Sequence, residues 1–443
     1  MKEYTNRELA KMIFPLVIEQ FLVMLVGICD TMMISYAGEA AISGVTLVDM
    51  LSYLIITVLT ALDTGGTVVV SQYLGQKNRG KANETAGQLF LITVLFASGI
   101  MAFCLLFHRP LLSGLFGQVE AAVMEAAVTY LLITAVSYPF LGIYNSGAAL
   151  FRSMGKTDVT MYVALLMNGI NIVGNAIGIF LFHAGVAGVA VPTLVSRVAA
   201  AAVMTWLAFQ QSNEIFLTGT AVFSWDRHTV GRILRIAVPG GIENGLFALG
   251  RLLVTSMVAL FGTAQIAANG VANSVDTIAI LVVNAVNLAI VPIVGQCMGA
   301  GEPDAASRYT KKLMGLSYAS AAILGGGVIL ELPFILGFFQ MTEETYRLSW
   351  ILITAHNVLA FALHPTSFNL ANSLRAAGDV RITMWTGILS MIVFRLGTAY
   401  LLGIVLGYGI FGVWAAMGMD WMARSAVFVV RYRNGRWRSI RAI

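Results

Sequence analysis

The chain has 443 residues, of which 58% are hydrophobic and only 11% are charged, and its formal net charge is +5. Because a soluble globular protein carries about 25% charged residues, this composition excludes a soluble fold for most of the chain. The positive charge does not indicate nucleic-acid binding, since the basic residues lie between apolar segments and not on one folded face.

Apolar runs of about twenty residues recur from end to end, and each can cross a hydrocarbon core about 30 Å thick. The polar segment 1–11 precedes a run that is too long for the core of a signal peptide, so we expect a retained first span. The sequence predicts an all-α integral membrane protein with twelve transmembrane helices, at 12–36, 45–75, 86–108, 121–144, 159–182, 185–210, 233–262, 267–297, 311–337, 345–372, 381–405 and 408–431.

The basic residues predict the orientation of these spans. Of the 27 Lys and Arg residues, only Arg109 and Arg347 fall in loops or at span ends on one side, and four arginines fall deep within spans. The remaining 21 lie in the two terminal tails, in the loops after the even-numbered spans, or at the span ends beside these loops. Since cytoplasmic loops are enriched in Lys and Arg, we expect both termini to be cytoplasmic in a multi-pass protein of the cell membrane.

The chain also repeats itself at a spacing of 224 residues. This shift places Pro15 on Pro239 and Glu19 on Glu243, and a shift of 223 places Arg152 on Arg375. We therefore predict two six-helix lobes related by a pseudo-two-fold axis along the membrane normal. Their predicted limits are 1–212 for the N-terminal lobe, 213–232 for a cytoplasmic linker, and 233–443 for the C-terminal lobe.

Span 1 carries two acidic residues, Glu19 and Asp30, eleven positions apart. At 100° per residue they lie on one helix face, about 16 Å apart along the axis. An acid at the centre of a span costs about 2.5–3.5 kcal/mol on insertion scales, so both are candidate functional residues. Two acids on one face suit a path for a cation or a proton. The alternative is that each neutralises a nearby arginine or caps a broken helix.

Spans 2 and 8 carry matching polar faces. The residues are Asp49, Ser52, Thr60 and Asp63 in span 2, and Asn273, Asp276, Asn284 and Asn287 in span 8. We interpret these faces as walls of a central cavity, to which we also assign Tyr130, Glu19 and Glu243; hydrogen bonding between helices is the alternative. Span 5 places Asn168, Asn171 and Asn175 on one face. Their amide oxygens suit a hard cation such as Na⁺, but they could equally join helices.

Two other patterns have simpler explanations. The segment from Gly75 to Lys81 has the spacing of a phosphate-binding loop, but Ala82 occupies the position of the magnesium-binding Ser or Thr. We therefore expect no ATP site. Gly174 and Gly178 have the spacing of close helix packing. The loops are too short for a nucleotide-binding domain, and no catalytic set or metal cluster stands out, so we expect no enzyme activity.

Several short segments together are specific, although none is decisive alone. They are Pro15 with Asp30-Thr31, Ser71–Gly75, Pro239–Glu243, Val294–Gly301, and Asp420-Trp421 with Arg424. With them the chain resembles the multidrug and toxic compound extrusion (MATE) family over essentially its whole length, and in its C-terminal tail a bacterial branch close to NorM-like transporters. The resemblance implies two lobes with a cavity between them, and efflux of organic cations or amphiphilic drugs.

The resemblance also implies a coupling-ion site in the first lobe. Its matching residues are Asp30, Asn171 and Thr193, with Asn175 where many relatives carry an Asp. This departure leaves one formal charge instead of two, which weakens the expected Na⁺ affinity and favours H⁺ coupling through Asp30. A Na⁺ ion would use Asp30, Asn171 and Asn175.

In the second lobe the family's usual acids are absent. Phe247 occupies the position of the span 7 acid, and the span 10 acid aligns near His364. Glu243 and Asp276 are our substitutes for them.

We expect secondary active efflux by antiport against H⁺ or Na⁺, with alternating access between the lobes. Small organic cations and the bilayer are the expected partners, without nucleic acid or ATP, in a monomer that needs no cofactor beyond the coupling ion. The alternative within the same superfamily is a flippase for lipid-linked sugars or other lipids. The mostly acidic charges within the spans favour cationic cargo. A receptor or membrane enzyme without transport activity is the remaining class.

Overall fold

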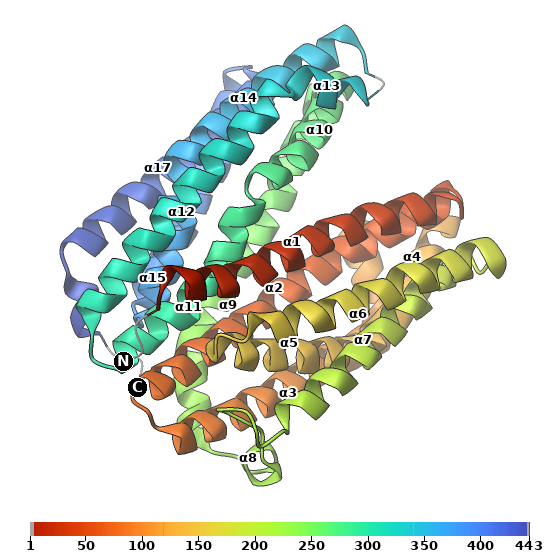
Figure 1. Ribbon diagram of the computed structural model, residues 1–443. Coiled ribbons are helices and arrows are strands. Elements are labelled where there is room, and N and C mark those ends of the chain that lie inside the picture. The colour runs from red at the N-terminus through yellow and green to blue at the C-terminus, as the bar shows by residue number, and fades with distance from the viewer. Residues whose placement is uncertain (1–3, 118, 340, 441–442) are drawn as a thin grey trace. The chain divides into compact units, whose positions relative to one another are not determined.

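The computed structural model describes residues 4–117, 119–339, 341–440 and 443. In these residues all regular structure is helical (Figure 1), which confirms the predicted all-α fold. The chain divides into two compact units inside helix α9 (Arg227–Val258), between Val238 and Pro239. We call the residues up to Val238 the first lobe and those from Pro239 onward the second lobe.

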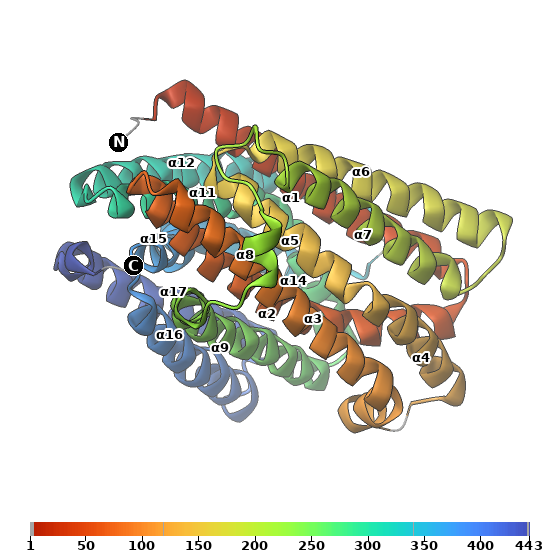
Figure 2. The same ribbon diagram turned by 90° about the horizontal axis from the view of Figure 1, so that it is seen from below.

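The first lobe is built from long helices that pack along one another. Helix α1 packs along α6, α6 packs along α7, and α2 packs against α3, α4 and α5, as Figures 1 and 2 show. The helices are α1 (Asn6–Ser35), α2 (Glu39–Gly75), α3 (Arg79–Phe116), α4 (Ala121–Val136), α5 (Tyr138–Ser153), α6 (Thr157–Ala176), the π-helical η1 (Ile177–Leu181), α7 (Ala187–Ala208) and α8 (Gly219–Phe223).

The segment predicted as a linker packs onto the first lobe. The Gln88 side chain of α3 donates hydrogen bonds to the carbonyls of Ala221 (2.8 Å) and Ser224 (2.6 Å), and it accepts one from the backbone of Asp226. Asp226 in turn precedes α9 and accepts bonds from the backbone of His228 and Thr229. The Thr229 hydroxyl and these amides hold the pKa of Asp226 at about 2, so the charged form stabilises the start of α9.

The second lobe contains shorter helices and more breaks. Its elements after α9 are η2 (Ala259–Phe261), α10 (Thr263–Ala279), α11 (Leu281–Gly299), α12 (Pro303–Leu330), α13 (Leu332–Gly337), α14 (Glu343–His364), η3 (Pro365–Asn369), α15 (Leu370–Ala376), α16 (Val380–Leu389), η4 (Ser390–Gly397), η5 (Tyr400–Val405), α17 (Gly409–Arg433) and η6 (Arg436–Ser439). Of these, η3, η4 and η5 are π-helical. π-Helical turns of this kind often occur at functional sites.

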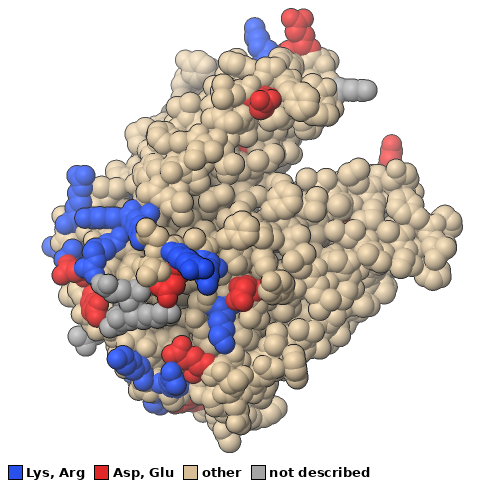
Figure 3. Space-filling model, viewed as in Figure 1, with Lys and Arg blue, Asp and Glu red and all other residues tan. Residues whose placement is uncertain are grey.

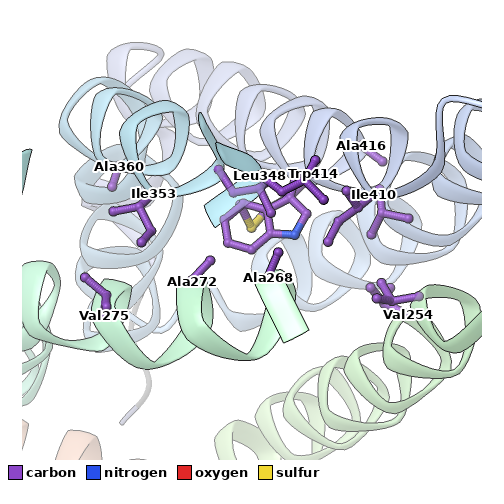
Figure 4. Packing of buried hydrophobic residues seen from close by; sticks show 14 of the residues in the cluster. Val254, Ala268, Ala272, Val275, Leu348, Ile353, Ala360, Ile410, Trp414 and Ala416 are labelled. Atoms are coloured by element: carbon purple, nitrogen blue, oxygen red, sulfur yellow. The ribbon is translucent and has the colours of Figure 1, made fainter. Parts of the chain in front are cut away.

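An apolar cluster forms the core of the second lobe. The Trp414 indole of α17 lies against Ala268 and Ala272 of α10, with Leu348 and Ile353 of α14 nearby (Figure 4). All of these side chains are buried. Small alanines on α10 let the large indole approach the helix backbone closely, which fixes where Trp414 lies beside the polar residues of α10.

The predicted spans agree with the helices. Ten helices of the described residues are long and apolar enough to cross a membrane, and α4 with α5, bent by 46°, would make an eleventh. The remaining predicted span corresponds to α17, which carries a buried ion pair between Asp420 and Arg424 (3.0 Å) and is therefore less apolar. On the face in Figure 3, charged side chains gather near helix ends and leave the long sides of the helices largely uncharged.

The close packing predicted at Gly174 and Gly178 is confirmed. A Cβ atom added at Gly178 would collide with the backbone of Gly188 on α7, and one at Gly174 would lie 2.7 Å from Pro192. The second lobe repeats this contact, because a Cβ at Gly412 of α17 would lie 2.6 Å from the backbone of Gly403 on η5. Backbone approach of this kind replaces hydrophobic packing as a source of helix association in lipid.

We expect Gly178→Ala to destabilise the first lobe by about 1–3 kcal/mol, because the added methyl group has no room. The measurement is the thermal unfolding midpoint of the purified protein in detergent. Gly169→Ala, on α6 in open space, is the matched control and should leave the midpoint unchanged or raise it. Equal midpoints for Gly178→Ala and the unaltered protein would contradict this view of the contact.

Candidate functional site

Four side chains predicted to form a coupling site lie in one hydrogen-bonded chain. Asn175 Nδ2 donates to Asp30 Oδ1 (2.6 Å) and to Asn171 Oδ1 (3.3 Å), and Asn171 Nδ2 donates to Thr193 Oγ1 (3.0 Å). We call these residues the Asp30 cluster. The two asparagines are buried, whereas Asp30 is partly exposed. Helices α1, α6 and α7 therefore meet around one carboxylate, as the spacing of the asparagines on one face requires.

A second carboxylate and an arginine stand beside this cluster. Asp49 of α2 and Arg197 of α7 both lie within electrostatic range of Asp30. Tyr130 of α4 hydrogen-bonds to Asp49, and Arg197 Nη1 donates to Ser137 Oγ (2.6 Å). The sequence showed Arg197 only as a charge within span 6. Its position four residues after Thr193, on the same helix face, was the signal that could have placed it here.

The orientation of the Asn175 amide decides which of its atoms Asp30 meets. The amide of Asn175 points its donor at Asp30, while its own Oδ1 is buried without a hydrogen-bond partner. Turning this amide over would present an oxygen to a cation beside Asp30. In the described residues no three His, Cys, Asp or Glu side chains are grouped to hold a metal ion. A Na⁺ ion here would therefore depend on amide and hydroxyl oxygens.

Glu19 and Glu243, predicted as cavity residues, each pair with an arginine. Arg152 of α5 pairs with Glu19, and the Thr160 hydroxyl also donates to it (3.0 Å). In the second lobe Arg375 Nη2 lies 2.5 Å from Glu243 Oε2. Both partners of each pair coincide under the sequence repeat, so the duplication preserves a whole ion pair. This is the arrangement weighed above as the alternative for Glu19.

The remaining residues of the two polar faces have contacts within their own lobes. Asp63 is buried within electrostatic range of Arg152, and one of its oxygens has no hydrogen-bond partner. Its repeat counterpart Asn287 accepts a bond from Asn372 (3.0 Å). Asn273 lies on the preceding helix, α10, where it donates to the carbonyl of Asn269 (2.8 Å). Asp63, Asn287 and Asn273 therefore each have different surroundings.

Asp276 has a partner that the sequence did not reveal. His356 Nδ1 of α14 lies 3.1 Å from Asp276 Oδ1, and Asn357 Nδ2 donates to the same oxygen (3.2 Å). All three side chains are buried. The His356 ring makes edge contacts with Trp414 and Trp421. His356 has no counterpart in the repeat, since a shift of 224 places it on Leu132.

His364, predicted to stand near the position of a family acid, is the last residue of α14, eight residues after His356. It ends α14 at the point where Pro365 opens the π-helical turn η3, since proline has no N–H for the regular ladder. The buried ring packs on Phe368 (4.4 Å between centroids) and on the edge of Trp421. Aromatic surroundings of this kind place His364 in an apolar part of the lobe.

A family model matches the chain twice. The model for the MatE family covers residues 15–177 and again residues 239–401, which are offset by 224 positions. The chain belongs to the MatE family. The same offset confirms the internal repeat, because one model of a half-transporter describes both segments.

The most similar relatives and structures agree with a MATE transporter. An uncharacterized transporter of Bacillus subtilis, YisQ, is 28% identical, with 96% of this chain and 93% of the relative covered. A probable multidrug resistance protein NorM of Thermotoga maritima is 24% identical over 98% of this chain and 93% of its own length. A solved outward-facing multidrug resistance MATE transporter has a TM-score of 0.90 at 17% identity, covering 98% and 99% of the two chains.

Because the chain belongs to the MATE family of multidrug efflux transporters, the role of Asn175 can be tested by measuring transport. We expect Asn175→Asp to make transport respond more steeply to Na⁺. Two neighbouring carboxylates repel each other, and a bound cation relieves this repulsion. The measurement is the Na⁺ concentration dependence of efflux at fixed pH. Asn168→Asp, two turns earlier on the same face of α6, is the control and should leave that dependence unchanged.

Proposed function

We propose that this MATE transporter is a secondary antiporter that couples the efflux of small organic compounds to inward movement of H⁺ or Na⁺ at Asp30. The observation that supports it best is the Asp30 cluster. One carboxylate within a span accepts a hydrogen bond from Asn175 and lies in electrostatic range of Asp49 and Arg197. An intramembrane carboxylate with movable polar partners suits reversible binding of a cation.

Coupling requires that the ion interacts differently with two states of the protein. A proton on Asp30 weakens the hydrogen bond from Asn175 and the attraction of Arg197, because both act on the negative charge. A sodium ion requires the Asn175 amide to turn its oxygen inward. Either event changes the bonds that join α1 to α6 and α7, and thereby the relative stability of the conformations that alternate during transport.

The charges within the first lobe support a cationic or amphiphilic cargo. Glu19, Asp30, Asp49 and Asp63 lie within its spans, with Glu125 near the start of α4, against Arg197 within a span and Arg152 at the end of α5. Relatives with the name of multidrug resistance proteins are consistent with this cargo class. We also propose that the protein is a monomer. Both termini should lie in the cytoplasm, since 21 of the 27 basic residues then lie on the cytoplasmic side.

The test uses the purified protein in liposomes that contain ethidium. Transport should follow an imposed gradient of H⁺ or of Na⁺ and should stop when that gradient is collapsed by an ionophore. The gradient that drives transport names the coupling ion. Absence of ethidium movement under both gradients, with the protein shown to be folded and inserted, would refute cation-coupled efflux of this cargo class.

A further inference from the structure

The second lobe contains a small cavity that none of the roles above uses. Its volume is about 50 Å³, and helices α9, α10 and α17 line it together with the π-helical η4. Its polar lining consists of Arg251, Thr255, Asn269, Asn273 and Arg395, and Trp414 supplies an aromatic wall. We call this cavity the arginine pocket. Its volume is that of a single functional group and is too small for a drug molecule.

Two arginines line this pocket, of which Arg251 is exposed and Arg395 is partly buried. Arg395 of η4 lies in electrostatic range of Arg251 on α9 and of Arg424 on α17. Among the described residues Asp420 is the acid that acts on Arg395, but its Oδ1 is held by Arg424 Nε at 3.0 Å. The buried Nε of Arg395 has no hydrogen-bond partner. Like charges close together inside a membrane-spanning lobe are unfavourable, so the arrangement favours an added negative charge.

Within the spans of the second lobe, arginines outnumber buried acids. The buried acids of its spans are Glu243, Asp276 and Asp420, while Glu331, Glu343 and Glu344 are exposed at helix ends. The arginines are Arg251, Arg375, Arg395 and Arg424, and Glu243 is paired with Arg375 and lies 3.8 Å from Arg424. Arg251 and Arg395, which line the arginine pocket, contribute two of these four positive charges. This sign is opposite to that of the first lobe, where acids exceed arginines.

The uncharged residues of the pocket are held in fixed positions. Trp414 Nε1 donates to Asn269 Oδ1 (3.0 Å), and the indole packs on the alanines of α10 (Figure 4). Asn273 Nδ2 bonds back to the carbonyl of Asn269. The guanidinium groups are planar and present paired donors, which match the two oxygens of a carboxylate or phosphate group. The rigid indole gives an apolar surface next to them.

We propose that the arginine pocket binds a carboxylate or phosphate group, on a molecule whose apolar part lies along Trp414. This goes beyond the proposed function, because an organic cation alone does not complement the positive charge of the pocket. The cargo class it implies is an amphiphile that carries an anionic group, with or without a cationic one. The same chemistry is present in the headgroup of an anionic lipid, and the experiment separates these two sources.

The test measures binding to the purified full-length protein in a detergent free of anionic lipid. The probes are benzoate and phenyl phosphate, with benzyl alcohol as the neutral analogue and trimethylphenylammonium as the cationic one. We expect both anions to raise the thermal unfolding midpoint in a saturable way, with no saturable change from the other two. The apparent affinity for the anions should fall about tenfold or more in Arg251→Gln and in Arg395→Gln.

Matched variants separate loss of binding from loss of folding. Arg347→Gln removes an exposed arginine at the start of α14 and should leave anion affinity unchanged. Arg395→Lys keeps the charge but not the paired donors, so it should fold and bind the anions more weakly than the unaltered protein. Anion affinity that is the same in the unaltered protein, Arg251→Gln and Arg395→Gln would overturn the proposal. So would the absence of saturable binding to the folded protein.

A second arm identifies the source of the group. The protein is placed in lipid nanodiscs with and without phosphatidylglycerol, and benzoate binding is measured in each. Competition by phosphatidylglycerol that disappears in Arg395→Gln would place a lipid headgroup in the pocket; binding unaffected by this lipid would identify the soluble anion as the ligand. No ion gradient is used, so failure here would leave coupling at Asp30 untouched, and failure of ethidium transport would leave anion binding untouched.

Discussion

Asp30→Asn should lower gradient-driven efflux by about tenfold or more while the protein still inserts and folds. The substitution keeps the size of the side chain but removes the charge that a proton or Na⁺ ion neutralises. It also replaces an acceptor facing Asn175 with an amide, so the contact between α1 and α6 persists without responding to the ion. The measurement is ethidium efflux from liposomes under the gradient that drives the unaltered protein.

The control for this variant is Asp158→Asn, which removes an exposed acid at the start of α6. Its efflux should match that of the unaltered protein. Exchange of ethidium across the membrane in the absence of any gradient should survive in Asp30→Asn, because the cargo can still bind. Full gradient-driven efflux in Asp30→Asn would exclude this carboxylate as the coupling group.

The second large effect is expected on stability, at the ion pair that the repeat preserves. Glu243→Gln leaves the largely buried Arg375 guanidinium without its carboxylate, whereas Arg424 keeps its partner Asp420. Removing one partner of a buried pair costs about 3–5 kcal/mol, because the other charge remains desolvated. For a lobe of this size the thermal unfolding midpoint should fall by about 10 °C.

The double variant Glu243→Gln with Arg375→Met should regain part of this loss, since it removes an uncompensated charge as well as its partner. The corresponding change Glu19→Gln should destabilise the first lobe, because the largely buried Arg152 then lacks its carboxylate. Measurement of all three midpoints in one detergent tests whether the two pairs are equivalent. A midpoint for Glu243→Gln equal to that of the unaltered protein would show that the pair contributes nothing to stability.

Much of the fold could be predicted because it depends on one-dimensional patterns. Apolar runs mark the helices, and the 224-residue offset that joins Pro15 to Pro239 reappears in the family match. The Asp30 cluster was also accessible, since Asn171 and Asn175 share a helix face and the family pattern supplies Asp30 and Thr193. Its hydrogen bonds agree with that expectation, and its role in coupling remains the proposal tested above.

The missed residues act between helices that are distant in the chain. His356 is 80 residues from Asp276, and no periodicity joins them, although the structure places them 3.1 Å apart. Arg251 and Arg395 were visible as charges within spans, but only the packing of α9 against η4 shows that they face one pocket. The predicted preference for cationic cargo treated all spans together. When each lobe is considered by itself, and Arg152 and Arg375 are included with the helices that hold them, the two lobes differ in the sign of the net charge within their spans.

The position of the lobe boundary inside α9 bears on how the two halves of this duplicated chain can be separated. A fragment that ends at residue 212 would lack the acceptors of Gln88 and the buried Ile233 and Ile236, which belong to the first lobe. It would also lose Arg232, which hydrogen-bonds to Tyr73. The ancestral half-length unit therefore does not correspond to an autonomous half of the present protein. The first turns of the second repeat, up to Val238, are part of the compact unit of the first lobe.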